Sequence, residues 1–511
     1  MAQEGKKIKR ALVSVYHKDG LDSILKMLHE NQVELLSTGG THSFIESLGL
    51  PCRKVEDLTG YPSILGGRVK TLHPKVMGGI LSRRDEESDN LESTKYEIPE
   101  IDLVIVDLYP FTETVASGAS REEIIEKIDI GGITLIRAAA KNYKDVAIVA
   151  SKAQYGILQA ILMERGAWTS LDERFMLARE AFAVSSAYDS AIFGYFESAG
   201  APTGFRLALD GARSLRYGEN PHQSGLYFGD LGAMFEQLHG KEISYNNLLD
   251  IDAATELIAD FSDAQPTVAI LKHNNACGVA VRPTLKQAWL DALSGDPVSA
   301  FGGIVVANNE IDSETALEID KIFFEVVIAP SYTPEALEVL KHKKNRIILV
   351  QKQPNVGKTK YRSCLNGALV QDADRKSETT ADLKVVTKIV PTDTQISDLL
   401  FANKIVKHSK SNSIVLAKNG CLCASGVGQT SRVDALKHAI EKARAFGFDL
   451  DGAVMASDAF FPFPDCVEIA GKAGIKAVIH PGGSIRDAES VEWCDKNGVA
   501  MVITGFRHFK H

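Results

Sequence analysis

The sequence predicts an α/β protein of two domains, the first built on a parallel sheet with helices on both faces. Three observations carry this prediction. The chain has 511 residues, which is too many for one ordinary hydrophobic core. Strands rich in Val and Ile alternate with amphipathic helices near the N-terminus. Further along, one long helix ends in a glycine-rich linker.

The elements of the first domain follow from hydrophobic periodicity and from turn residues. The strand in IDLVIVDLYPF must turn at Pro110, because proline lacks a backbone donor and restricts the residue before it. We expect strands at residues 11–15 and 33–36, a helix at 19–30, a helix beginning near His42, and strands in IDLVIVDLYPF and DVAIVA.

The domain boundary follows the long helix expected at residues 171–197. This helix ends in AGAPTG, the clearest linker signal in the chain, so the domains are placed at residues 1–199 and 200–511. In the second domain, TVAILKHNNACGVAV and SIVLAKNGCLCASGVG are each followed by a helix and a strand, which suggests two duplicated α/β subdomains. The basic segment KHKKNRIILVQKQPNVGKTKYR between them is expected to be an exposed joint.

Composition excludes several classes of protein. A net charge of −9 and a pI near 5.9 give no general attraction for nucleic acid or an anionic membrane, so any phosphate site must be local. No apolar run of about 18 residues and no signal peptide occur, which favours a cytoplasmic protein. The seven scattered cysteines are typical of reduced thiols, and none has zinc-site spacing, so no metal is expected.

The turn Ser37-Thr38-Gly39-Gly40-Thr41 is a candidate phosphate site. Its backbone N–H groups, its hydroxyl donors and the start of the next helix all suit an anion. Taken alone, an ordinary glycine turn with a helix cap explains it equally well. The turn matches neither the Walker loop nor the full dinucleotide fingerprint, which favours a nucleoside monophosphate over ATP or NAD.

A basic segment between two glycine pairs, GGRVKTLHPKVMGGIL, is the next candidate. It contains Arg68 and Lys70 among short apolar residues, a pattern that suits a pocket lining better than a solvated face. Asp129 follows later, before a glycine pair, and Lys141 lies on the next helix. No helical spacing relates Asp129 to Lys141, but they could converge if the glycine turn doubles back.

In the second domain, Lys272 and His273 end an apolar strand. Reacting groups of α/β proteins are commonly found at the carboxyl ends of parallel strands, so we expect this pair to be functional rather than structural. The segment LRYGENPHQ, which contains Arg216 and Tyr217, opens the same domain.

These motifs together identify a family. The sequence resembles the bifunctional purine-biosynthesis enzymes that join AICAR formyltransferase and IMP cyclohydrolase in one chain. The resemblance covers essentially the whole chain, in order, and includes STGGT, GGRVKTLHPKVMGGIL, DLYPF, IDIGGITLIRAAAKNY, LRYGENPHQ, KHNNACGVA, DPVSAFGGIVVAN, SNSIVLAKNG, GVGQTSR, SDAFFPFPD and FRHFKH.

The resemblance implies a methylglyoxal-synthase-like α/β domain that closes the purine ring, followed by two cytidine-deaminase-like α/β subdomains that transfer the formyl group. It implies catalytic roles for Lys70, Tyr109, Asp129, Lys141, Lys272 and His273. It implies substrate binding by Ser14, Lys18, Thr38, Gly39, Gly40, Thr41, Arg68, Thr71, Arg216, Tyr217, Asn412, Arg432, Phe460, Asp465 and Arg507. It also implies 10-formyltetrahydrofolate as co-substrate and a homodimer whose transferase sites draw residues from both chains.

The chemistry gives these residues roles. The acceptor amine is conjugated with an electron-poor imidazole and is a weak nucleophile, so it needs a base, for which His273 is suited at neutral pH. Lys272 can stabilise the oxyanion or protonate the leaving folate nitrogen. In ring closure Lys70 and Tyr109 can polarise the formyl oxygen, while Asp129 with Lys141 moves protons.

Some positions depart from the family pattern. Tyr16-His17 stands where many relatives have Ser-Asp, Asp107 where Asn is common, and Glu325 where some have Asp. Two other functions are alternatives to the one that the resemblance implies. A zinc deaminase requires a His-x-Glu with Pro-Cys-x-x-Cys signature, which is absent. A nucleotide-sensing protein is not excluded by the phosphate turn alone, but the nearby Lys, Tyr and Asp favour catalysis.

Overall fold

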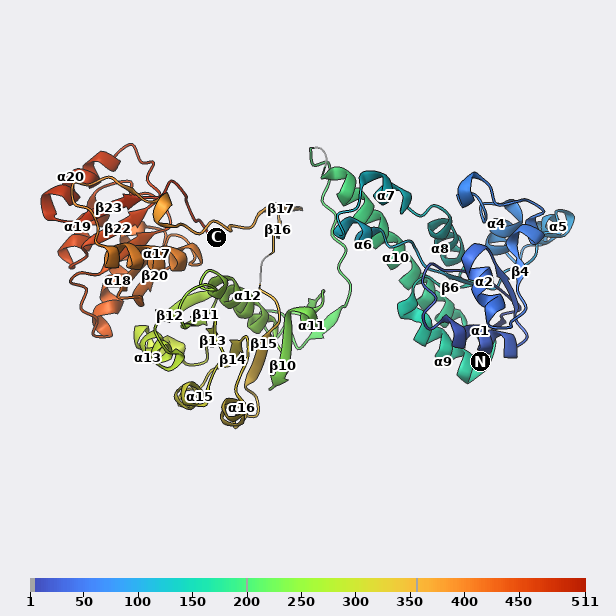
Figure 1. Ribbon diagram of the computed structural model, residues 1–511, viewed down its shortest axis with the longest axis horizontal. Helices are drawn as coiled ribbons and strands as arrows, with labels where there is room; N and C mark the ends of the chain where they lie inside the picture. Colours follow the sequence, from blue (N-terminus) through green and yellow to red (C-terminus); the bar gives the residue numbers. More distant parts are fainter. Residues whose placement is uncertain (1–4, 199–200, 355–356) are drawn as a thin grey trace. The chain divides into compact units, whose positions relative to one another are not determined.

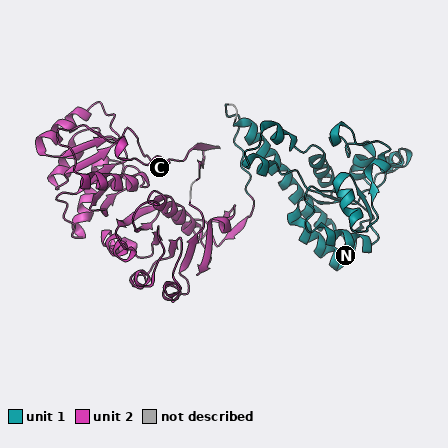
Figure 2. Ribbon diagram, viewed as in Figure 1, with its two compact units in different colours: residues 1–209 teal, residues 210–511 magenta. Residues whose placement is uncertain are grey.

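The computed structural model describes residues 5–198, 201–354 and 357–511. The chain divides into two compact units, residues 1–209 and 210–511 (Figure 2). The predicted boundary between residues 199 and 200 lies outside the described residues. The position of that boundary therefore stays a prediction.

The first unit contains a five-stranded parallel sheet in the order β4-β3-β2-β5-β6 (Figure 1). All four residues of β5 are buried, as expected for a strand covered on both faces. The predicted strands are confirmed within a residue or two. The strands of this unit are β1 (Lys6–Lys7), β2 (Arg10–Ser14), β3 (Glu34–Ser37), β4 (Arg53–Lys54), β5 (Leu103–Val106), β6 (Ala147–Val149) and β7 (Trp168–Thr169).

Helices surround this sheet, and the longest has the predicted bounds. Helix α10 (Leu171–Glu197) begins with a capping box, in which Ser170 and Glu173 bind each other's backbone N–H groups. It packs against α8 (Gly131–Lys141) and β6. The other helices are α1 (Leu21–Glu30), α2 (Gly39–Ser47), α3 (Val55–Thr59), α4 (Pro74–Leu81), α5 (Glu87–Lys95), α6 (Phe111–Ala116), α7 (Arg121–Glu126) and α9 (Tyr155–Arg165), with short 3₁₀ turns at Leu65–Gly67 and Lys152–Gln154.

The second unit is built on one mixed sheet of twelve strands, β10-β15-β14-β13-β11-β12-β20-β19-β21-β22-β23-β18. Two further two-stranded ribbons lie outside it, β8 with β9 and β16 with β17. The strands are β8 (Arg213–Leu215), β9 (Gly225–Tyr227), β10 (Phe235–His239), β11 (Thr267–Lys272), β12 (Asn275–Val281), β13 (Ile304–Ala307), β14 (Val326–Ala329), β15 (Ile347–Gln351), β16 (Thr359–Cys364), β17 (Gly367–Asp372), β18 (Lys384–Val385), β19 (Ile414–Lys418), β20 (Cys421–Gly426), β21 (Val454–Ser457), β22 (Ala477–His480) and β23 (Ala500–Ile503).

The two halves of this sheet repeat the same order of elements, in line with the two similar sequence segments. Each half has a helix, an antiparallel strand pair, another helix, and then parallel strands joined by helices. The halves meet where β12 pairs with β20. The helices are α11 (Leu231–Met234), α12 (Tyr245–Ala259), α13 (Leu285–Gly295), α14 (Pro297–Ala300), α15 (Ser313–Ile319), α16 (Pro334–Leu340), α17 (Asp393–Lys407), α18 (Arg432–Ala445), α19 (Asp465–Lys472) and α20 (Asp487–Asn497), with a 3₁₀ turn at Thr380–Asp382.

Two expectations about the second unit were wrong. Lys272 and His273 do not end a parallel strand, because β11 is antiparallel to both of its neighbours and His273 lies in the turn between β11 and β12. The segment expected to be an exposed joint contains β15, whose first three residues are buried in the sheet. The segment was expected to be exposed because lysines and an asparagine surround the short apolar run IILV, which forms the buried part of β15. Among the described residues, no helix is both long and apolar enough to cross a membrane.

Candidate active sites

In the first unit most of the predicted site residues gather at one edge of the sheet. The parallel strands β2, β3 and β5 end there, in Ser14, Ser37 and Val106. The strand order changes direction between β2 and β5, since β3 and β4 lie on one side and β6 on the other. Ligands of open α/β sheets bind at such a switch point, beyond the carboxyl ends of the strands.

The glycine turn after β3 leaves the start of helix α2 uncapped. Thr38 occupies the N-cap position, but its hydroxyl donates to Glu56 Oε1 at 2.8 Å instead of capping the helix. Thr41 donates to the Val15 carbonyl at 2.9 Å, which ties the turn to the loop after β2. Gly39 and Gly40 are exposed, so the helix start faces solvent. This arrangement favours an anion site over a simple capped turn.

Lys70 and Thr71 connect the glycine turn with the loop that carries Asp129. A side chain on Gly39 would place its Cβ 3.5 Å from Lys70 Nζ, so the ammonium lies at the turn. Thr71 is buried, and its Oγ1 would be 3.4 Å from a Cβ on Gly131. Arg68 instead points into solvent and forms an exposed ion pair with Glu126.

The departures at Tyr16-His17 and Asp107 lie in direct contact with each other. Asp107 accepts the backbone N–H groups of Tyr16 and His17, the latter at 3.0 Å, and its Oδ2 lies 3.0 Å from His17 Nδ1. In this chain the two positions pair a histidine with an aspartate. Next to them, Lys18 Nζ donates to the carbonyls of Val15 and Tyr16 at 2.7 and 2.9 Å. Partial burial lowers the pKa of Lys18.

Tyr109 and Asp129 are neighbours at this edge. Burial raises the pKa of Asp129, although its carboxylate accepts the Gly132 N–H at 2.6 Å and thereby also caps α8. Partial burial, and next the charge of Asp129, raise the pKa of Tyr109. Lys127 Nζ lies 5.7 Å from the centre of the Tyr109 ring. Lys127 was not predicted, since a lysine in IEKIDIGG carries no signal of its own.

Lys141 lies away from this group within one chain. The glycine pair after Asp129 begins helix α8 instead of doubling back, so Asp129 precedes the helix and Lys141 is its last residue. At 1.5 Å per residue the helix separates them by roughly 16 Å. Lys141 is exposed at that end. The structure therefore does not bring Asp129 and Lys141 together in a single chain.

In the second unit, α12 joins two predicted segments. The Asn246 side chain donates to the Glu219 carbonyl at 3.2 Å, in the segment that contains Arg216 and Tyr217. One helical turn later, Asp250 Oδ1 accepts the Asn274 N–H at 2.7 Å, in the turn that contains His273. Arg216 stacks on the Tyr217 ring, His273 is exposed, and Lys272 Nζ donates to the Phe301 carbonyl at 2.9 Å.

A second group forms around Arg432. Its Nη2 donates to Asn412 Oδ1 at 2.6 Å, and its Nη1 forms a buried ion pair with Asp458. The Asp458 carbonyl accepts the His508 N–H at 3.0 Å, next to Arg507. Asp458 was not predicted, because a buried partner of an arginine cannot be distinguished by sequence from the many exposed aspartates.

The remaining predicted residues lie around this group. Phe460, two residues after Asp458, is 36% exposed, and Asp465 begins α19. The exposed Arg507 guanidinium stacks over the Phe509 ring at 4.5 Å. The group also reaches the His273 turn, since the Lys410 N–H donates to Asn275 Oδ1 at 3.1 Å.

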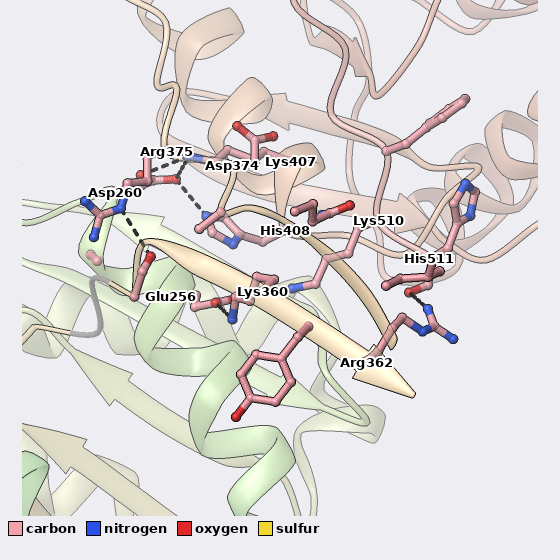
Figure 3. A pocket seen from close by; sticks show the side chains of 17 residues that line it. Glu256, Asp260, Lys360, Arg362, Asp374, Arg375, Lys407, His408, Lys510 and His511 are labelled. Carbon is pink, nitrogen blue, oxygen red and sulfur yellow. Dashed lines mark hydrogen bonds and ion pairs between the residues drawn. The ribbon is translucent and has the colours of Figure 1, made fainter. Parts of the chain in front are cut away.

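A pocket of about 640 Å³ lies between α12, the β16–β17 ribbon, the end of α17 and the C-terminal tail (Figure 3). Its charged side chains are largely paired with each other: Glu256 with Lys360, Asp260 with Lys407 and His408. None of the predicted site residues lines it. In the described part of the chain, no group of three or more His, Cys, Asp or Glu side chains is arranged to hold a metal ion.

Two family models match this chain. A family model described as the AICARFT/IMPCHase bienzyme matches residues 139–442, which is more than half of the chain. The chain belongs to the AICARFT/IMPCHase bienzyme family. A second model, described as an MGS-like domain, matches residues 20–134, a range that contains β3, β4 and β5 of the parallel sheet of the first unit. The family predicted from the motifs, with its formyltransferase and cyclohydrolase activities, is confirmed.

Relatives of this bienzyme family match over the full chain. A protein of Bacteroides thetaiotaomicron, named bifunctional purine biosynthesis protein PurH, is 67% identical over 508 residues, covering 99% of this chain and 100% of that protein. A protein of the same name from Aquifex aeolicus is 48% identical and covers 98% of this chain and 100% of its own length. Among solved structures, a crystal structure of ForH shares 34% identity and covers 37% of this chain and 98% of its own, with a TM-score of 0.33.

Proposed function

We propose that this bienzyme performs two consecutive steps of purine biosynthesis. The second unit transfers a formyl group from 10-formyltetrahydrofolate to AICAR, and the first unit closes the product, FAICAR, to IMP with loss of water. The similarity at 67% identity over 99% of the chain to a protein named for bifunctional purine biosynthesis carries this proposal. The two separate groups of polar residues, one in each unit, support it.

In the first unit the nucleotide phosphate binds at the uncapped start of α2, between the glycine turn and Lys70. Ser14, Lys18 and Thr71 border the same edge, and Arg68 reaches the phosphate after leaving its exposed ion pair with Glu126. The base then extends toward Tyr109 and Asp129. The order of the elements supports this placement, because the ends of β2, β3 and β5 all face the switch point of the sheet.

Ring closure requires the carboxamide nitrogen to attack the formyl carbon of the same molecule. Holding both groups in attack geometry supplies much of the acceleration, because the step is already intramolecular. Tyr109 donates its phenolic proton to the formyl oxygen, and Lys70 supplies positive charge there. Asp129 takes the proton from the attacking nitrogen, a role that its raised pKa supports by bringing the carboxyl closer to neutral pH.

The transferase reaction needs a base at the acceptor amine. His273 takes the amine proton while the amine nitrogen bonds to the formyl carbon. Lys272 protonates the departing folate nitrogen or stabilises the oxyanion. Arg216, Tyr217 and Arg507 bind the ribotide. Asn412 and Arg432, which are hydrogen-bonded to each other, also bind the substrate. Phe460 and Asp465 lie at the border of the site. The contacts of α12 with both the Glu219 and the Asn274 segments support one common site.

We further propose a homodimer whose transferase sites draw residues from both chains. The β16–β17 ribbon supports it, because all six residues of β17 are exposed and Leu369 and Val370 are among them. In such a dimer Lys141 acts in the cyclohydrolase site from a second copy, since its own Asp129 lies at the other end of α8. Each half of the second unit is a cytidine-deaminase-like subdomain, as the repeated element order suggests.

The test is incubation of the full chain with AICAR and 10-formyltetrahydrofolate. Tetrahydrofolate and IMP are followed together, and a second reaction starts from supplied FAICAR. The bienzyme forms both products in equal amounts. Binding of nucleotides without IMP formation from FAICAR would instead favour a sensor in the first unit.

A further inference from the structure

The turn that carries His273 has a counterpart in the other half of the sheet. His273 and Asn274 join β11 to β12 with φ of 51° and 63°, and Asn419 and Gly420 join β19 to β20 with φ of 54° and 63°. Two-residue turns with positive φ at both positions favour Asn-Gly. The second half has that pair. The first half has His-Asn instead, and both residues lie in the left-handed region, where Asn, Asp and His are the side chains most often found after Gly.

Each turn is held by an aspartate from the helix that packs on its half of the sheet. On α17, Asp398 accepts the N–H groups of Asn419 and Gly420 at 2.7 and 2.6 Å, one on each carboxylate oxygen. On α12, Asp250 accepts only the Asn274 N–H, at 2.7 Å, on Oδ1. Both carboxylate oxygens of Asp398 therefore accept backbone N–H groups of the Asn419 turn. In the half that contains His273, only one oxygen of Asp250 does so.

The charge of Asp250 acts on His273 as well as on the Asn274 N–H. Burial raises the pKa of Asp250, and the Asn274 N–H and the nearby His273 each oppose that effect. The other basic group next to this turn is Lys272, whose ammonium is turned to the Phe301 carbonyl. From the side of the second half, the Lys410 backbone N–H binds Asn275. Among these groups, Asp250 alone contributes negative charge.

We propose that Asp250 is a positioning residue for formyl transfer. It holds the His273 turn through the Asn274 N–H, and its charge stabilises the imidazolium that forms when His273 takes the amine proton. In that step the amine N–H bond breaks and an imidazole N–H bond forms, while Asp250 exchanges no proton. The inference depends on the proposed role of His273 as the base.

The test separates the charge of Asp250 from its hydrogen bond. Asp250→Asn keeps an oxygen for the Asn274 N–H and removes the charge, while Asp250→Ala removes both. The matched control is Asp398→Asn, the same change under the Asn419 turn. Transferase kcat and KM for AICAR are measured for each full-length variant. Circular dichroism and thermal unfolding establish that each variant is folded, and cyclisation of supplied FAICAR measures the first unit.

We expect Asp250→Asn to lower transferase kcat about 10- to 100-fold, the range seen when a metal-binding histidine loses the carboxylate that orients it. The KM of Asp250→Asn for AICAR should change little. Asp250→Ala should lose at least as much transferase kcat, and the kcat of Asp398→Asn should stay close to wild type. Wild-type kcat in a folded Asp250→Asn, or equal losses in Asp250→Asn and Asp398→Asn, would overturn the inference. Full transferase activity in His273→Ala would instead refute the proposed base.

Discussion

His508 connects the C-terminal tail to the body of the second unit, and its removal should make stability less dependent on pH. The side chain is 3% exposed, and its ring contacts two carboxylates, Asp374 at 2.6 Å and Glu378 at 2.9 Å. Burial by itself would lower the pKa of His508, but the hydrogen bonds to Asp374 and Glu378 outweigh burial and raise it to about 9. The perturbation is His508→Gln, which keeps the size and a hydrogen-bond donor without the charge.

The free energy that His508 contributes to folding follows from the difference between its pKa in the folded and in the unfolded chain. A histidine pKa raised from 6.5 to about 9 corresponds to about 3 kcal/mol of stability. Because the folded pKa is the higher one, this contribution is fully present below pH 6.5 and is lost as the pH rises to about 9. Nearly complete burial means that solvent screening reduces it little.

The assay is urea unfolding of the full chain at pH 6, 7.5 and 9, followed by tryptophan fluorescence. Two of the three tryptophans, Trp289 and Trp493, report on the second unit. The wild-type free energy of unfolding should fall across this range by about 3 kcal/mol more than that of His508→Gln. Parallel decreases in the two proteins would show that the imidazolium and its two carboxylates do not stabilise the tail.

The other predictions concern the separate sites and the metal. His273→Ala should lower the rate of formyl transfer by about 10²- to 10⁴-fold and leave cyclisation of FAICAR near wild type. Lys70→Ala should lower cyclisation and leave formyl transfer near wild type. Loss of both reactions in a folded His273→Ala would contradict the proposal that each reaction has its own site. Arg432→Ala should destabilise the second unit by about 3–5 kcal/mol, because it leaves the fully buried Asp458 carboxylate unpaired; an unchanged denaturation midpoint would show that the pair is dispensable. Dialysis against EDTA should leave both activities intact, and an activity restored by zinc would contradict this.

Much of the first unit could be predicted from the sequence, because its strands are short apolar runs between clear turn residues. Residues 11–15 and 33–36 show this well, as does the helix at 171–197 with its Ser170 cap. In the second unit, a buried strand such as β11 has the same composition whether its neighbours are parallel or antiparallel. The direction of β11 therefore could not be predicted.

Site residues with a reactive or charged side chain in a recognisable motif could be predicted from the sequence. The distances between these residues in the folded chain could not. Asp129 and Lys141 fit one motif, and only the helix that begins between them shows that they are separated. Residues that support the site were missed for another reason. Asp250 and Asp458 are single aspartates in helical or strand contexts, and their importance comes from what they contact across the sheet.

The contact between His17 and Asp107 also limits which side chains this loop accepts. An acidic side chain in place of His17 would set a second carboxylate close to that of Asp107, and the two would repel each other. Asp107 also accepts the backbone N–H groups of Tyr16 and His17, so its side chain fixes the path of the loop itself. Residues 16–17 and 107 therefore need to be exchanged together when this loop is transplanted into another protein of the family.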